Sequence, residues 1–93
     1  MKEIEGRKYI TISAIAGEIY RIRYEISAPI DIYNGTDSEI KIGIVSDFDS
    51  GNCYLTIGSG LSYNGFTAGV GGGEAVIYVS AAADGIISVA ARW

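Results

Sequence analysis

The sequence contains no histidine, and it has only one cysteine, one proline and one methionine among its 93 residues. The absence of histidine removes the commonest general base and the commonest imidazole ligand for a metal. Cys53 alone cannot form an intramolecular disulfide or a cysteine-based zinc site. Because no Lys or Arg stands near it in the sequence to favour a thiolate, we expect Cys53 to be a buried and inert thiol.

Positive charge and long apolar runs are scarce as well. Seven Lys and Arg residues oppose eleven Asp and Glu residues, which gives a net charge of −4. A nucleic-acid-binding surface is normally basic, and no apolar run approaches the ~20 residues that cross a bilayer. The first residues also lack the apolar stretch of a signal peptide. We therefore expect no nucleic-acid partner, no membrane association, and a protein that is cytoplasmic as synthesised.

The residues that are abundant are typical of β-strands. The chain has 16 Ile, 5 Val and 7 Tyr but only 2 Leu. β-Branched and aromatic residues favour the pleated, half-buried surface of a strand over a helix. A chain of this length builds one modest core and leaves little room for a deep active site. We therefore expect one all-β domain over residues 1–93 and no enzyme activity.

Alternation with a period of two residues marks the strands. In residues 18–28 the apolar side chains of one face are Tyr20, Ile22, Tyr24, Ile26 and Ala28. Residues 9–16 alternate in the same way, and Ala16-Gly17 indicates a tight turn that joins the two segments as a long hairpin. The core is expected to contain Ile22, Tyr24, Ile42, Ile44, Ile77 and Val79.

Turn residues divide the rest of the chain at spacings near ten residues. Further strands are expected at 30–33, 39–45, 53–57, 66–70, 75–81 and 86–91. Asn34-Gly35 is a strong turn signal and is expected to end the strand at 30–33. About eight short strands of this kind predict a single antiparallel β-sandwich, jelly-roll-like in its topology.

The segment Ile4-Glu5-Gly6-Arg7 matches a protease recognition sequence that is often placed in expression tags. Two interpretations stay open, namely native sequence and the remnant of a tag. Residues 1–7 are therefore a candidate for a flexible N-terminal arm or for such a remnant ahead of the sandwich.

Asp47, Asp49 and Asn52 are the weak candidates for a metal site. Calcium loops place oxygen ligands at alternate positions, and the two aspartates have that spacing. However, Gly51 precedes Asn52, the wrong order for a helix-flanked calcium loop, and Gly58 stands where its bidentate Glu belongs. We favour an Asx-rich turn, with a weak surface Ca²⁺ site as the alternative, and predict no cofactor.

Several strands are apolar on both faces, for example at Val76-Ile77 and Ile86-Ile87. One small sandwich cannot cover both faces, so the pattern predicts a homo-oligomer. The side chains that oppose the inward set or end the chain are the expected interface: Tyr78, Ile87, Val89 and Trp93. Aromatic residues near turns suggest an alternative, a lectin-like module that binds carbohydrate through Tyr63 and Trp93.

The stretches 54–65, 74–81 and 85–89 together resemble small all-β virion proteins of tailed bacteriophages. Each combines an apolar strand with Gly/Ser or Asp-Gly turns, as in capsid decoration proteins and head- or tail-fibre domains. The resemblance implies a trimeric jelly roll that belongs to a larger assembly such as a capsid or tail. The leading hypothesis is therefore a non-enzymatic structural or interaction module, possessing trimeric symmetry and associated with a virion.

Overall fold

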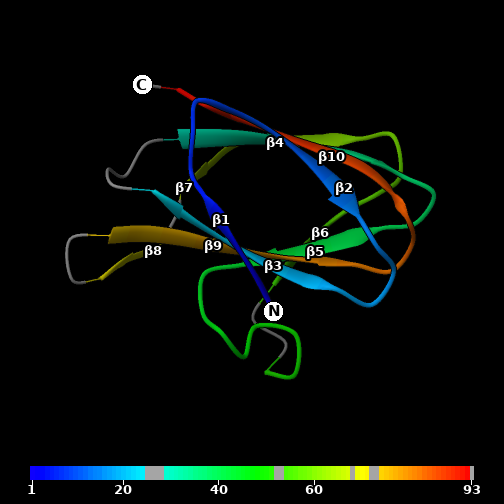
Figure 1. Cartoon of the computed structure of the whole chain (residues 1–93), viewed down its shortest axis with the longest axis horizontal. Helices are drawn as coiled ribbons and strands as arrows, with labels where there is room; N and C mark the ends of the chain where they lie inside the picture. Colours follow the sequence, from blue (N-terminus) through cyan, green and yellow to red (C-terminus); the bar gives the residue numbers. More distant parts are fainter. Residues whose placement is uncertain (25–28, 52–53, 68, 72–73, 93) are drawn as a thin grey trace.

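The computed structural model describes residues 1–24, 29–51, 54–67, 69–71 and 74–92, and these form two packed β-sheets (Figure 1). In chain order the strands are β1 (Lys2–Glu5), β2 (Tyr9–Ala14), β3 (Ile19–Tyr24), β4 (Pro29–Thr36), β5 (Ile40–Gly43), β6 (Leu55–Ile57), β7 (Ser62–Thr67), β8 (Gly69–Gly71), β9 (Glu74–Ala81) and β10 (Gly85–Ala91). The described residues contain no helix, and hence none long and apolar enough to cross a bilayer. The predicted all-β sandwich is confirmed.

The strands are divided between two sheets that we call sheet A and sheet B. Sheet A has the order β1-β3-β9-β5-β6, with β8 also paired to β9, and sheet B has the order β2-β10-β4-β7. In Figure 1, β4, β10 and β2 cross the upper part of the molecule, while β9, β3 and β5 lie below them. Most connections along the chain pass from one sheet to the other, and only β5–β6 and β8–β9 are sequential hairpins among the described strands.

The predicted hairpin of residues 9–16 and 18–28 is wrong. β2 pairs with β10 in sheet B, whereas β3 pairs with β1 and β9 in sheet A. The apolar faces of the two segments, with Ile12 on β2 and Ile22 on β3, both belong to the buried core. The chain changes sheets in the turn at 15–18, where Gly17 has a φ of 86° and its N–H donates to Ala81 O at 2.9 Å.

The first residues are part of sheet A. β1 pairs with β3 in parallel, from Lys2 opposite Tyr20 to Glu5 opposite Arg23. It is the one parallel pair among the described strands, and Ile4 packs against the core. The segment suggested as a flexible arm thus forms the edge of the sheet.

The core lies between the two sheets and is built from the inward-facing positions of both. Five of the six residues predicted for it are buried: Ile22, Tyr24, Ile42, Ile77 and Val79. Ile44 is the exception, with 48% of its surface exposed. β5 ends at Gly43, so the chain has left the sheet before Ile44 and the alternation no longer decides its direction.

Asn34-Gly35 does not form the predicted turn, because β4 continues through it to Thr36. The Asn34 side chain is fully buried, and its amide donates to Ser38 O at 2.8 Å and to Ile57 O at 2.9 Å. Its carbonyl oxygen accepts from Thr36 N at 3.0 Å and from Thr36 Oγ1 at 2.7 Å. A buried amide with all of these partners is stable in a strand, since nothing polar is left unsatisfied.

Candidate functional site

The outer face of sheet B is an open surface of polar and aromatic side chains. Register places Tyr9, Ala90 and Asp31 in one row across β2, β10 and β4. The next row runs through Thr11, Ser88, Tyr33 and Ser62, and the third through Ser13, Ile86 and Gly35. The intervening residues of these strands face the core, so the outer face alone is available to a ligand.

A shallow depression of about 330 Å³ lies on this face. Its floor contains the small side chains of Ser88 and Ala90 on the central strand, and Tyr9 and Tyr33 stand to either side. Tyr9 is 73% exposed and Tyr33 is 44% exposed. Standard sheet spacing puts the Cα atoms of these tyrosines about 12 Å apart on a diagonal across β10. We call this surface the tyrosine trough.

Asp31 lies at the end of the tyrosine trough nearest Tyr9, where it binds Arg92. Arg92 Nη2 donates to Asp31 Oδ1 at 2.7 Å, and Arg92 Nε donates to Oδ2 at 3.0 Å. Gly65, at a bulge of β7, donates its N–H to Oδ1 at 2.9 Å. The guanidinium, and secondarily the Gly65 N–H, hold the pKa of the Asp31 carboxyl below its usual value. The charges of Asp31 and Arg92 neutralise each other, and Lys8, whose Nζ lies 6.0 Å from the centre of the Tyr9 ring, adds one positive charge beside the trough.

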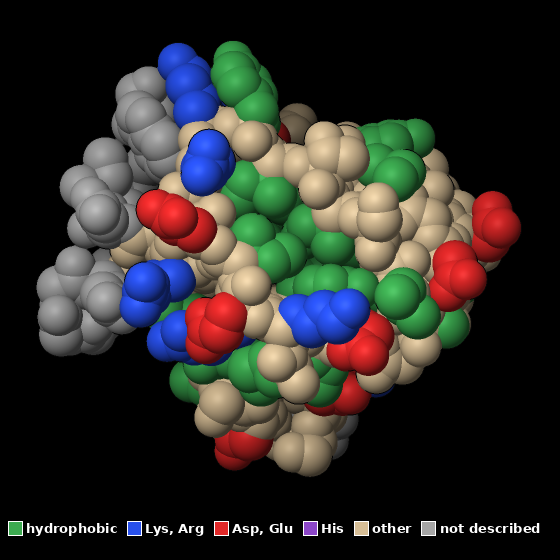
Figure 2. All heavy atoms as spheres, in the orientation of Figure 1, with side chains coloured by type: hydrophobic (Ala, Val, Ile, Leu, Met, Phe, Trp, Pro, Cys, Tyr) green, Lys and Arg blue, Asp and Glu red, His purple; other side chains and the backbone are tan. Residues whose placement is uncertain are grey.

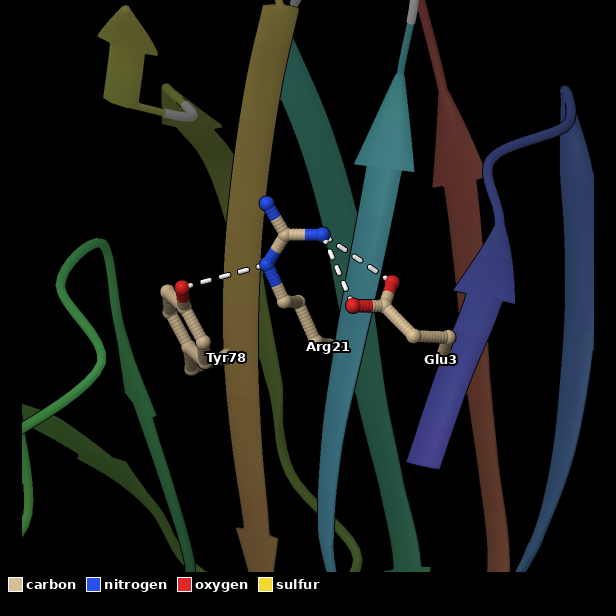
Figure 3. Close-up of polar contacts among 3 residues, drawn as sticks. All are labelled: Glu3, Arg21 and Tyr78. Carbon is tan, nitrogen blue, oxygen red and sulfur yellow. Dashed lines mark hydrogen bonds and ion pairs between the residues drawn. The ribbon is translucent and has the colours of Figure 1, made fainter. Parts of the chain in front are cut away.

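The outer face of sheet A differs because its side chains bind one another. Glu3, Arg21 and Tyr78 form one row across β1, β3 and β9 (Figure 3). Arg21 Nη1 donates to both carboxylate oxygens of Glu3, at 2.9 and 3.0 Å, and Arg21 Nε donates to Tyr78 Oη at 3.2 Å. The hydrogen bond with Tyr78, followed by that with Glu3, raises the pKa of Arg21.

The segment after β5 covers part of this face. Phe48 is fully buried, and its ring stacks on Tyr78 with 5.9 Å between ring centroids. A Cβ atom at Gly43 would stand 2.5 Å from the Phe48 Cβ, so glycine is required beneath the ring. Lys41 Nζ donates to Asp49 Oδ1 at 2.7 Å, which fixes the same segment from its other side. Among the described residues of sheet A, the aromatic ring of Tyr78 is thus covered at the centre of the face.

The structure does not expose the predicted interface. Ile87 is fully buried and Val89 is 2% exposed, because both point from the central strand of sheet B into the core. Tyr78 does face outward but is only 8% exposed beneath Phe48. The direction assigned to Ile87 and Val89 is thus wrong, and Trp93 lies outside the described residues.

Of the carbohydrate and metal candidates, Tyr63, Asp47 and Asp49 lie among the described residues. Tyr63 is 38% exposed, but it pairs with Ile32, so it lies on the core side of β7 and contacts Phe66 edge to face. Asp49 binds Lys41, and the Asp47 carbonyl accepts from Gly51 N at 2.8 Å, as in a turn. No group of three metal-binding acidic or thiol side chains occurs in the described part of the chain. Asn52 and Cys53 lie outside the described residues.

Sequence reasoning did not identify Tyr9 and Tyr33 as partners in one site. The alternation in residues 9–14 does place Tyr9 and Thr11 opposite Ile10 and Ile12. That signal gives the outward direction of Tyr9, but the trough also needs β10 and β4, which join β2 only through long-range pairing.

No protein-family profile and no curated protein matches the sequence. Among solved structures, the chain is similar to the pre-peptidase C-terminal domain of collagenase from Bacillus anthracis. The TM-score is 0.60 with 19% sequence identity, and the match covers 98% of this chain and 93% of that one. The similarity extends over the whole sandwich, and at this identity it establishes the fold alone.

Proposed function

We propose that the chain is a non-catalytic binding domain whose tyrosine trough holds an uncharged carbohydrate chain. The observation that carries the proposal is the pair of exposed tyrosines on a diagonal across a floor of small residues. Tyrosine rings offer a flat apolar face together with a hydroxyl group, and both complement the faces and hydroxyls of sugar rings. The two rings are far enough apart to contact different units of one chain.

The polar groups of the trough fit the same ligand. The hydroxyls of Thr11, Ser88 and Ser62 make no side-chain hydrogen bond to any other described residue, so they are available to a ligand. Asp31 and Arg92 are bound to each other at one end of the trough, and Lys8 Nζ lies 6.0 Å from the centre of the Tyr9 ring. The trough thus offers hydroxyls and two aromatic rings beside a single cation, which suits a polyhydroxylated chain without charge.

Affinity electrophoresis through soluble neutral polysaccharides, followed by calorimetry with the best of them, tests this proposal. Tyr9→Ala and Tyr33→Ala should each weaken binding roughly tenfold or more, as loss of a stacked aromatic side chain does elsewhere. Tyr63→Ala is the matched control, since Tyr63 is also exposed but lies off the trough. Equal binding by all three variants, or no retardation in any polysaccharide, would reject the proposal.

A second candidate function is a self-associating structural module, which one apolar patch favours. Ile44, Val45 and Leu55 are each between 42 and 48% exposed. Ile44 and Leu55 border a cavity of about 310 Å³ beside Phe66. A homo-oligomer would bury this patch, in place of the interface first predicted, and assembly into a capsid or tail remains a prediction. Light scattering on wild type and Leu55→Lys tests it, since only wild type should exceed the mass of one chain.

A further inference from the structure

The segment Asn34-Gly35-Thr36 has the sequence of an acceptor site for N-linked glycosylation, Asn-X-Thr with X other than Pro. Of the three asparagines in the chain, Asn34 alone is followed two positions later by Ser or Thr. An acceptor asparagine in a folded protein normally lies in a surface loop, where an enzyme can reach its amide nitrogen. The structure instead places this segment in β4, an inner strand of sheet B.

Both hydrogens of the Asn34 amide group are used within the sandwich. Nδ2 donates to Ser38 O at 2.8 Å and to Ile57 O at 2.9 Å, and the residue has no exposed surface. The two acceptors belong to different parts of the fold, since Ser38 precedes β5 and Ile57 ends β6. A sugar on Nδ2 would replace one of these hydrogens by a carbon atom. One hydrogen bond would then be lost, and a close-packed interior has no room for the sugar ring.

The hydroxyl group that completes the acceptor sequence is buried as well. Thr36 is 2% exposed, and its Oγ1 donates to Asn34 Oδ1 at 2.7 Å. The backbone of Asn34 is paired with the turn between β6 and β7, because its N–H donates to Leu61 O at 2.9 Å and its carbonyl accepts from Gly60 N at 2.8 Å. An enzyme therefore reaches the acceptor segment only after this turn and the end of β6 have separated from β4.

We propose that Asn34 is a glycosylation site of the unfolded chain alone, so that folding and N-linked glycosylation compete for the same amide. In the unfolded chain, an oligosaccharyltransferase transfers an oligosaccharide from a lipid diphosphate carrier to Nδ2. The bond between the sugar C1 and the diphosphate oxygen breaks, the Nδ2–C1 bond forms, and one Nδ2 proton passes to a base of the enzyme. The lipid diphosphate is the leaving group. A modified chain cannot restore both hydrogen bonds of the Asn34 amide and does not complete the sandwich.

The neighbouring strand offers a matched control, because β10 runs directly beside the acceptor segment. Register pairs Thr36 with Gly85, and Asp84 in the turn before β10 is exposed. Asp84→Asn together with Ile86→Thr creates a second Asn-Gly-Thr sequence at this turn. Figure 2 shows acidic side chains standing out from the right-hand end of the molecule, where Figure 1 places the turn. The two acceptor sequences of this double variant lie side by side and differ in burial.

The test incubates the full chain with a single-subunit oligosaccharyltransferase and a lipid-diphosphate-linked oligosaccharide, and peptide mass spectrometry measures the occupancy of each site. In the folded double variant, position 84 should be modified at least about tenfold faster than Asn34. Ile22→Ala leaves a cavity in the core, raises the unfolded fraction, and should speed modification of Asn34 by about tenfold or more. Chains modified at Asn34 should lack the strand signal in circular dichroism.

Three results would overturn the proposal. Equal rates at Asn34 and at position 84 of the folded double variant would show that burial does not protect the amide. An Asn34 that stays unmodified in Ile22→Ala would show that the segment is no acceptor even in an open chain. A chain modified at Asn34 that melts at the wild-type temperature would show that the sandwich accommodates the sugar. If Ile22→Ala does not fold at all, it represents the unfolded chain, and the same expectation for Asn34 holds.

Discussion

The strands of both sheets alternate in the same way, but the two outer faces of the sandwich differ in how far their aromatic side chains are exposed. On sheet A, Arg21 and Tyr78 are bound to neighbouring side chains, and Phe48 covers the centre. On sheet B, Tyr9 and Tyr33 remain exposed. The difference arises from one segment, residues 44–51, which returns over sheet A after β5 and has no counterpart over sheet B among the described residues. Whether a polar sheet face can bind a ligand is thus decided by the connections around it.

Two glycines show the same contrast in detail. Gly43 of sheet A makes room for Phe48, which is fully buried above it. Gly35 of sheet B is required by the backbone instead, because a Cβ atom there would stand 2.5 Å from Ile86 O, with the Tyr33 ring 3.3 Å away. Tyr33 itself remains 44% exposed. The glycine of sheet A thus makes room for a buried ring, whereas the glycine of sheet B allows the neighbouring strand to approach beside an exposed ring.

The largest expected effect on stability comes from removing the Phe48 ring, which covers the outer face of sheet A. Phe48→Ala deletes a fully buried ring and should lower the free energy of unfolding by about 3–5 kcal/mol. Urea denaturation measures this as a lower midpoint. Gly43→Ala, which introduces an atom into the space beneath the ring, should act in the same direction. Unchanged midpoints in both variants would mean that residues 44–51 contribute nothing to stability.

A second prediction concerns a tyrosine in the core, for comparison with those on the surface. Burial raises the pKa of Tyr24 from 10.0 to about 12. The stability that protonated Tyr24 contributes is therefore complete below pH 10. It is lost as the pH rises from 10 through 12, which lowers the free energy of unfolding by on the order of 2 kcal/mol. Unfolding experiments across this range, with Tyr24→Phe as the variant that cannot ionise, measure the loss. The same slope in both proteins would assign it to other groups.

The third prediction concerns the stability contributed by an exposed tyrosine on the outer face of sheet B. Tyr33→Ala removes a half-exposed ring from sheet B and should change stability by about 1 kcal/mol or less. Measured beside Phe48→Ala, it gives the energetic difference between the two faces. A loss equal to that of Phe48→Ala would make Tyr33 a structural residue and would weaken its assignment to a binding surface.

The smallest expected effect belongs to the exposed ion pair of sheet A. Glu3→Gln removes the charge that faces Arg21, and Arg21 keeps its bond to Tyr78. The melting temperature should fall slightly at low ionic strength and match wild type near about 1 M salt, where exposed charges are screened. A difference that persists at high salt would show that hydrogen-bond geometry, rather than charge, holds the strand.

The direction of most side chains could be predicted from the sequence, because it depends on local alternation. Ile22 illustrates this, since it is flanked by Arg21 and Arg23 of the opposite face. Where two apolar residues follow each other the pattern is ambiguous, and the prediction failed at one such pair: Ile86 is 44% exposed and Ile87 is fully buried. With both positions apolar, the order of the strands in the sheet decides which one faces inward.

Strand pairing and the tyrosine trough could not be predicted for a related reason. Alternation in residues 9–14 says which face of β2 is apolar, but not that its neighbour is β10 at the other end of the chain. The trough needs Tyr9 and Tyr33 from strands that both pair with β10. A site assembled by pairing between distant segments leaves no local pattern in either of them.

The buried position of Asn34 has a consequence for the chemical ageing of the protein. An asparagine followed by glycine deamidates when the next backbone nitrogen attacks its side-chain carbonyl carbon, and the chain contains two such pairs. The side chain of Asn34 is held by hydrogen bonds of 2.7–3.0 Å and cannot turn toward Gly35, whereas Asn64 is exposed. Peptide mass spectrometry after prolonged incubation should find the added mass at Asn64 long before Asn34. Deamidation at Asn34 would thus indicate that the sandwich had unfolded. The fraction of Asn34 that stays unmodified would measure how long the sandwich has remained folded.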